Sequence, residues 1–118
     1  MERLCVSLET AKRLKAAGFP QYSSAVEFWN DMAGAWHIRQ SVRNPVATIL
    51  AAPTAQELAD ELPECVEHEF PNDLVISRQS PLYFVSYEHA DDDIVFAADK
   101  NLAEALAFLY LKLHEAQS

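Results

Sequence analysis

The sequence predicts a single small α+β domain over residues 1–118, with three helices and antiparallel β-hairpins or a sheet in the order α-ββ-α-βββ-α. Apolar residues recur at helical spacing in three segments, residues 7–17, 54–62 and 101–117. The segments between them read as strands, and residues 36–42 alternate apolar and polar residues, as a strand with one solvent-exposed face does. A chain of 118 residues that is 50% hydrophobic can bury one core without disulfides or metals. The order of elements also suggests an αββ-αββ-α repeat.

The first helix is expected over residues 7–17. Ser7 is its candidate N-cap, because a serine oxygen can accept a hydrogen bond from a backbone N–H of the first turn. Gly18 supplies the left-handed residue of a C-cap, and Pro20 prevents the helix from continuing. The buried stripe of this helix is predicted to be Leu8, Ala11 and Leu14.

A β-hairpin is expected next, with arms at residues 25–30 and 36–42 around a turn at residues 31–34. The second arm alternates, so one of its two faces should be buried. The face predicted to be buried carries Trp36, Ile38, Gln40 and Val42. Residues 46–50 form either a short further strand or an extended approach to the next helix.

The second helix is expected to begin at Thr54, which forms a candidate capping box with Glu57. Its buried stripe is predicted to be Ala55, Leu58, Ala59 and Leu62. Three strands should follow, at residues 74–79, 82–89 and 94–98. The middle strand is apolar on both faces, which is typical of a central strand that is covered on each side.

The C-terminal helix, residues 101–117, is the element around which the chain should be organised. Asn101 is its candidate N-cap, and Glu104 completes a candidate capping box. One apolar stripe is formed by Leu102, Leu106, Leu109 and Leu113. Phe108 and Leu111 point the other way, and one sheet cannot cover both faces. The second face is therefore expected to meet another helix of the same chain or a second copy of the protein.

The formal net charge of −9 is concentrated in the second half of the chain, where residues 51–118 carry −11. Because affinity for phosphates comes from Lys and Arg, direct nucleic-acid binding is disfavoured. No apolar run is long enough to span a membrane, and no basic region precedes an apolar core at the N-terminus. We therefore expect a cytoplasmic protein with no membrane contact. Cys5 and Cys65 are expected to be free thiols.

Two clusters combine His with Asp or Glu, as metal-binding and acid–base sites do, but their residues do not have the spacing of a known motif. The first cluster is His89, Asp91, Asp92 and Asp93. The second cluster is Glu67, His68 and Glu69. The first matches no EF-hand or zinc motif and is interpreted as a solvated hairpin tip, and the second is interpreted as an exposed linker. The sequence also has no Gly-rich phosphate loop, nucleophile elbow or HExxH motif, so it predicts no catalytic residue, no metal and no cofactor.

Four segments occur together in a distinctive order. They are LETAKRLKAAGFPQ (8–21), APTAQELADELP (52–63), YFVSY (83–87) and KNLAEALAFLYLKL (100–113). As a set, which covers a little under half of the chain, they resemble small uncharacterised proteins encoded by bacteriophages and prophage-bearing bacteria. The resemblance implies a phage or prophage context. It implies no activity and no site residues, because no activity is established for that family.

The leading functional hypothesis is a non-catalytic accessory protein that acts through protein contacts, for which a homodimer is one arrangement. The candidate contact residues are Trp29, Trp36, Phe108 and Leu111. The alternative is an acidic inhibitor that mimics nucleic acid and occupies the site of a host DNA- or RNA-binding enzyme. Its candidate acidic face is Glu57, Asp60, Glu61 and Glu64.

Overall fold

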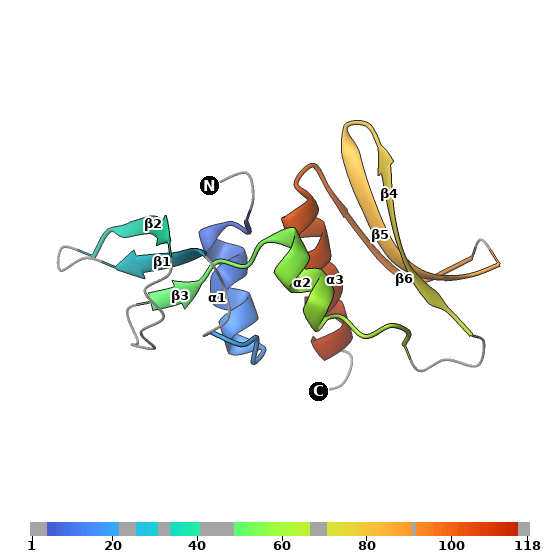
Figure 1. Ribbon diagram of the computed structural model, residues 1–118, viewed down its shortest axis with the longest axis horizontal. Helices are drawn as coiled ribbons and strands as arrows, with labels where there is room; N and C mark the ends of the chain where they lie inside the picture. The colour runs from blue at the N-terminus through green and yellow to red at the C-terminus, as the bar shows by residue number, and fades with distance from the viewer. Residues whose placement is uncertain are drawn as a thin grey trace.

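The computed structural model describes residues 5–21, 26–30, 34–40, 49–66, 71–90 and 92–115 (Figure 1). In chain order the elements are α1 (Leu8–Ala16), β1 (Val26–Asn30), β2 (Trp36–Gln40), β3 (Ile49–Ala51), α2 (Ala55–Glu61), β4 (Asp73–Gln79), β5 (Leu82–His89), β6 (Asp92–Asp99) and α3 (Leu102–Glu115). The predicted α+β class and order are confirmed, with β3 as a short additional strand before α2. None of the described helices has the length and apolar character needed to cross a membrane.

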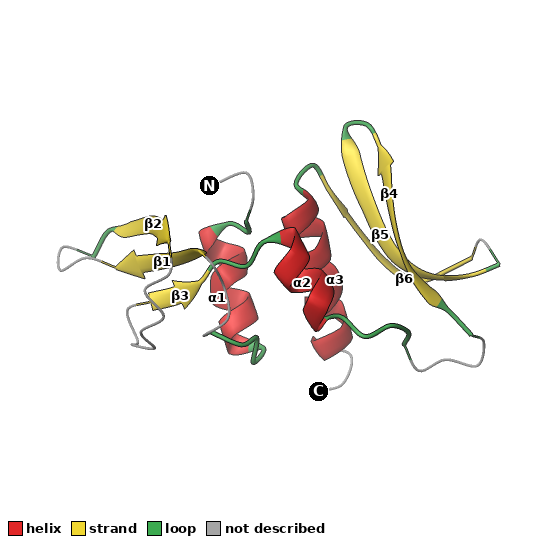
Figure 2. Cartoon of the chain, viewed as in Figure 1, coloured by secondary structure: helices red, strands yellow, loops and turns green. Residues whose placement is uncertain are grey.

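The strands form two separate antiparallel sheets, one on each side of the helices (Figure 2). The first sheet has the order β2-β1-β3, and the second has the order β4-β5-β6. β1, the first strand of the first group, is therefore central in the first sheet. In the second sheet the central strand is β5, the second strand of its group. This difference in topology is not what a repeated αββ unit would produce, so the suggested repeat is not present in the strand order.

The elements are arranged in successive layers along a molecule of 51 × 32 × 19 Å. Figure 1 shows the first sheet at one end, then α1, then the pair of α2 and α3, and the second sheet at the other end. The contacts follow the same order, because α3 touches α1 and α2 on one side and β5 and β6 on the other. The main core therefore surrounds α3.

Local capping accounts for the ends of α1. The Ser7 Oγ accepts a hydrogen bond from the Thr10 N–H at 3.3 Å, as predicted. At the other end, the Phe19 N–H donates to the Leu14 carbonyl at 2.9 Å, while Gly18 has a φ of +92°. This is a Schellman C-cap, whose left-handed position glycine occupies without steric cost.

The start of α2 also follows the prediction. The Glu57 N–H donates to Thr54 Oγ1 at 3.4 Å, and the Thr54 N–H donates back to the Glu57 carboxylate at 2.9 Å. These reciprocal bonds form the capping box. Leu58, on the apolar side of this short helix, is fully buried in the main core.

The capping box predicted for α3 is only half right. Asn101 Oδ1 accepts from the Glu104 N–H at 3.2 Å, as an N-cap does. However, the Asn101 N–H donates to Asp99 Oδ1 at 2.8 Å, so the Glu104 carboxylate does not return to it. That carboxylate instead accepts from the Ser7 N–H and, at 2.7 Å, from Thr10 Oγ1. Glu104 therefore joins the start of α3 to the start of α1.

α3 is buried on more than one face, as predicted, and helices of the same chain provide the cover on its second face. Six of the described side chains on this helix are 2% exposed or less: Ala103, Ala105, Leu106, Ala107, Leu109 and Leu111. Leu111 thus belongs to the core, which corrects its prediction as a partner contact. Phe108 is half-buried and packs against the same core.

The second sheet is covered by helices on one face only among the described residues. β5 is central, as predicted, and its Val85 and Tyr87 side chains are fully buried against the helices. On the opposite face, Phe84 is half-buried and Phe96 on β6 is 48% exposed. On this outer face of β5 no described helix provides cover, although Ser86 is buried there.

Truncating a side chain at the centre of α3 tests this description of the core. We expect Leu106→Ala to lower the free energy of unfolding by about 2–5 kcal/mol, because it leaves a cavity among helices that cannot close over it. Urea denaturation measures this change. Lys15→Ala, on an exposed position of α1, should change stability by less than about 0.5 kcal/mol. A Leu106→Ala variant as stable as the control would show that α3 is not the centre of the core.

Candidate binding cleft

The face of the first sheet that points toward α1 carries the apolar side chains of the hairpin. Antiparallel register places Phe28 opposite Ile38, and Asn30 opposite Trp36, so these side chains share one face. Phe28 and Ile38 pack beside a small cluster of buried residues. That cluster consists of Cys5, Val26 and Ala52. The alternation predicted for Trp36 and Ile38 is therefore confirmed.

Two adjoining cavities lie between this face and the start of α1. Among the described residues, the larger cavity, of about 430 Å³, is lined by Leu8, Phe28, Trp36, His37 and Ile38. The smaller cavity, of about 290 Å³, shares three of these residues and adds Val6 and Ser7. We call the two together the aromatic cleft. Its described lining is mostly apolar, with Ser7 and His37 as exposed polar residues.

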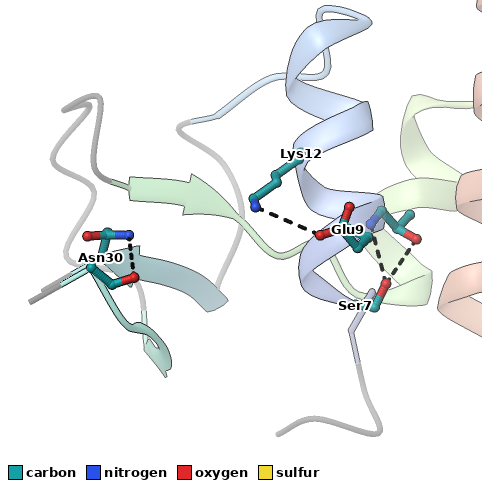
Figure 3. A network of polar contacts seen from close by, with 6 residues as sticks. Ser7, Glu9, Lys12 and Asn30 are labelled. Carbon is teal, nitrogen blue, oxygen red and sulfur yellow. Dashed lines mark hydrogen bonds and ion pairs between the residues drawn. The ribbon is translucent and has the colours of Figure 1, made fainter.

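Polar contacts hold the two walls of the aromatic cleft in place. Ser7 is fixed by its bonds to Thr10, and Lys12 forms an ion pair with Glu9 at 3.8 Å (Figure 3). The Lys12 ammonium also lies 5.7 Å from the centroid of the Trp36 ring, within the range of a cation–π contact. On the sheet, the Asn30 side chain donates to the Gly34 carbonyl at 3.3 Å and closes the hairpin turn. The half-buried Trp36 ring is thus held against α1.

Trp29 does not belong to the aromatic cleft. It is paired with His37 in the register, one position away from the pair formed by Asn30 and Trp36. Because successive residues of a strand point to opposite faces, Trp29 and Trp36 lie on opposite faces of the hairpin. The Trp29 ring packs on the His37 ring, with centroids 4.8 Å apart. Trp29 and Trp36, both candidate contact residues, therefore do not form one surface.

The predicted acidic face is shorter than expected. The Glu57 carboxylate is engaged in the capping box of α2. The exposed carboxylates that remain are Asp60, Glu61 and Glu64. Asp60 accepts a hydrogen bond from Gln56 at 2.9 Å, and no described Lys or Arg forms an ion pair with any of the three. A compact negative surface remains at the end of α2.

The clusters with reactive composition lie at the edges of the described structure. Glu67, His68, Glu69 and Asp91 lie outside the described residues. The His89 Nδ1 lies 2.8 Å from the Pro71 carbonyl oxygen, which orients the ring toward the backbone. Within the described ranges, no three His, Cys, Asp or Glu side chains come together as metal ligands would. Cys5 is buried and Cys65 is exposed, and neither is in a disulfide.

Two buried tyrosines carry the largest electrostatic effects in the described chain. Burial, with a smaller contribution from the nearby Cys65, raises the pKa of Tyr87 to about 12. The Tyr87 hydroxyl donates to the Pro63 carbonyl, which ties the segment after α2 to the second sheet. Burial and then the charge of Glu61 raise the pKa of Tyr110, whose ring stacks on His114. Both groups serve packing and lie away from the aromatic cleft.

Comparisons of the chain with protein-family models, with curated proteins and with solved structures find no match. The sequence places Trp36 and Ile38 on one face of the hairpin, but it does not identify Leu8 or Phe28 as residues of the same cleft. The alternation of the strands gives their faces, whereas the position of α1 against that sheet depends on contacts between distant parts of the chain.

The buried Tyr87 makes stability depend on pH in the alkaline range. Its neutral form is favoured in the folded state, so the contribution is complete below pH 10 and is lost as pH rises through about 12. We expect the free energy of unfolding to fall over this range, and Tyr87→Phe to remove part of that slope. Urea denaturation at several pH values, with phenolate absorbance of the native protein, measures both effects. A Tyr87→Phe variant with an unchanged phenolate titration would contradict this assignment.

Proposed function

We propose that this protein is a non-catalytic accessory protein that acts in the cytoplasm by binding another protein through the aromatic cleft. The observation that carries the proposal is the cleft itself, in which aromatic and aliphatic side chains from α1, β1 and β2 remain only partly covered. A few residues supply most of the binding energy of a protein interface, and large aromatic side chains, Trp in particular, are common among them. The accessory role rests on the resemblance of four sequence segments to phage-encoded proteins.

The occupant that fits best is one or two large apolar side chains of a partner protein. A small-molecule site usually has a few convergent polar groups that orient the ligand inside an apolar pocket. Here the described polar side chains of the lining are those of Ser7 and His37, and both residues are exposed to solvent. An apolar interior with a polar margin is the arrangement of a protein-binding hot spot.

The two tryptophans provide a matched pair of variants. We expect Trp36→Ala to lose at least tenfold in affinity for the partner, because it removes the largest side chain of the cleft, while Trp29→Ala keeps the partner. Immobilised wild-type and variant proteins would be exposed to host lysate, and bound proteins would be quantified by mass spectrometry. The partner should remain bound at high salt, because apolar contacts are not screened. Equal loss in both variants, or none in Trp36→Ala, would rule out the aromatic cleft.

A second candidate function is the occupation of a nucleic-acid-binding surface by the carboxylates of α2. It is favoured by the three exposed carboxylates at the end of that helix, none of which is in an ion pair with a described Lys or Arg. A basic partner would meet them as it meets phosphates. Such binding would weaken steeply as salt increases.

Neutralising this surface separates the two candidates. The variant carries Glu57→Gln, Asp60→Asn, Glu61→Gln and Glu64→Gln, and glutamine at position 57 preserves the capping box. Under binding through the aromatic cleft, we expect this variant to retain the partner at wild-type affinity in the same mass-spectrometry assay. A salt-sensitive partner that this variant loses and Trp36→Ala retains would instead assign the function to the acidic surface.

A further inference from the structure

The two edge strands of the second sheet, β6 and β4, differ in how they are protected against pairing with another chain. At the β6 edge, the Lys112 side chain on α3 reaches the strand and its Nζ donates to the Phe96 carbonyl. The same ammonium lies 5.1 Å from the centroid of the Phe96 ring. A lysine bound across an edge strand blocks pairing with another chain. β6 is therefore a closed edge.

The β4 edge lacks this protection. β4 is seven residues long and contains neither Pro nor Lys. Within the described part of the chain it pairs with β5 only, and α3 packs on β5 and β6. The one basic side chain of the strand, Arg78, lies over the ring of Tyr83 on β5 rather than across the edge. The outward N–H and C=O groups of β4 thus form a template for a further strand.

The most exposed apolar side chain on this edge lies at the midpoint of β4. Ile76 is 47% exposed, although Val85, its partner across the register, is fully buried. The two side chains are on the same face, so Ile76 lies beyond the part of the sheet that α3 covers. Another apolar side chain placed beside Ile76 would cover it.

We propose that β4 pairs antiparallel with β4 of a second copy, with Ile76 at the two-fold axis. The register around this centre is self-complementary, as an isologous dimer requires. Its opposed pairs are Ile76 with Ile76, Val75 with Ser77, Leu74 with Arg78, and Asp73 with Gln79. No like charges are opposed, whereas a parallel pair in register would oppose Asp73 to Asp73 and Arg78 to Arg78. The two second sheets become one continuous six-stranded sheet.

The size and charge of this contact determine its strength. A seven-residue strand is about 24 Å long and a sheet is about 10 Å thick, so the contact is small for a protein interface. Two copies that each carry −9 also repel one another. The dimer should consequently be weak, and it should become tighter as salt screens the repulsion. This interface would lie at the end of the molecule opposite the first sheet and its aromatic cleft (Figure 1). The proposed dimer does not depend on the proposed function.

Sedimentation equilibrium of the full chain tests the dimer directly. At about 0.5 mM protein we expect a dimer fraction that increases between about 0.1 M and about 0.5 M salt. Ile76→Lys should be at least tenfold weaker, because it opposes two ammonium groups across the axis. Phe96→Ser is the control, since Phe96 is equally exposed and its removal leaves the backbone carbonyl that Lys112 binds, and this variant should dimerise as the wild type does. Wild-type protein that is monomeric at this concentration would overturn the proposal, as would a dimer that survives Ile76→Lys.

A cysteine at the axis tests the register independently. Ile76→Cys, combined with Cys65→Ser to remove the exposed native thiol, should form a disulfide-linked dimer under mild oxidation, because opposed Cβ atoms lie close together. Phe96→Cys with Cys65→Ser should link at least tenfold more slowly. Equal rates of linkage in the two proteins would exclude β4 pairing centred on Ile76.

Discussion

The fold depends on the burial of α3 between the second sheet and the other helices. Its side chains from Ala105 to Leu111 contact opposite layers, so the sheet β4-β5-β6 and the helices α1 and α2 share one core. Without α3, the buried Val85 and Tyr87 of β5 would lose their cover. The first sheet is less dependent on this core, because it packs through a separate small cluster around Cys5 and Val26. The aromatic cleft lies where these two apolar regions meet, at the shared residue Phe28.

A few polar contacts between distant parts of the chain fix how the layers meet. Glu104 binds the first turn of α1 across 97 positions of sequence, and Tyr87 binds the Pro63 carbonyl across 24. The buried Asn72 joins its own segment to Val66 through two hydrogen bonds, at 2.8 and 2.9 Å. Each contact satisfies groups that would otherwise be buried without a partner or left to water. Together they give the apolar layers a defined orientation.

The features that could be predicted best from the sequence are the helix caps, because they depend on residues that are close together in the chain. The caps at Ser7 and Thr54 use side chains three positions from the N–H groups they satisfy, and the cap at Gly18 uses backbone groups at most five positions apart. All three were predictable because they depend on neighbouring residues. Whether Trp29 and Trp36 lie on the same face was not predictable, because that depends on the register of the hairpin. Pairing of Asn30 with Trp36 separates the tryptophans, and a register shifted by one residue would have placed them together. The position of β3 beside β1, and of the aromatic cleft beside α1, likewise depends on long-range packing.

The central claim is that α3 joins the second sheet to α1 and α2 in one core, and native-state hydrogen exchange along this helix tests it most directly. A helix that these elements share can open only when the core that they form unfolds. The amides of Ala105 to Leu111 should therefore exchange with the free energy of global unfolding measured by urea denaturation. Exchange of these amides at a lower free energy than those of β5 would contradict the account, because it would show that the second sheet persists without α3.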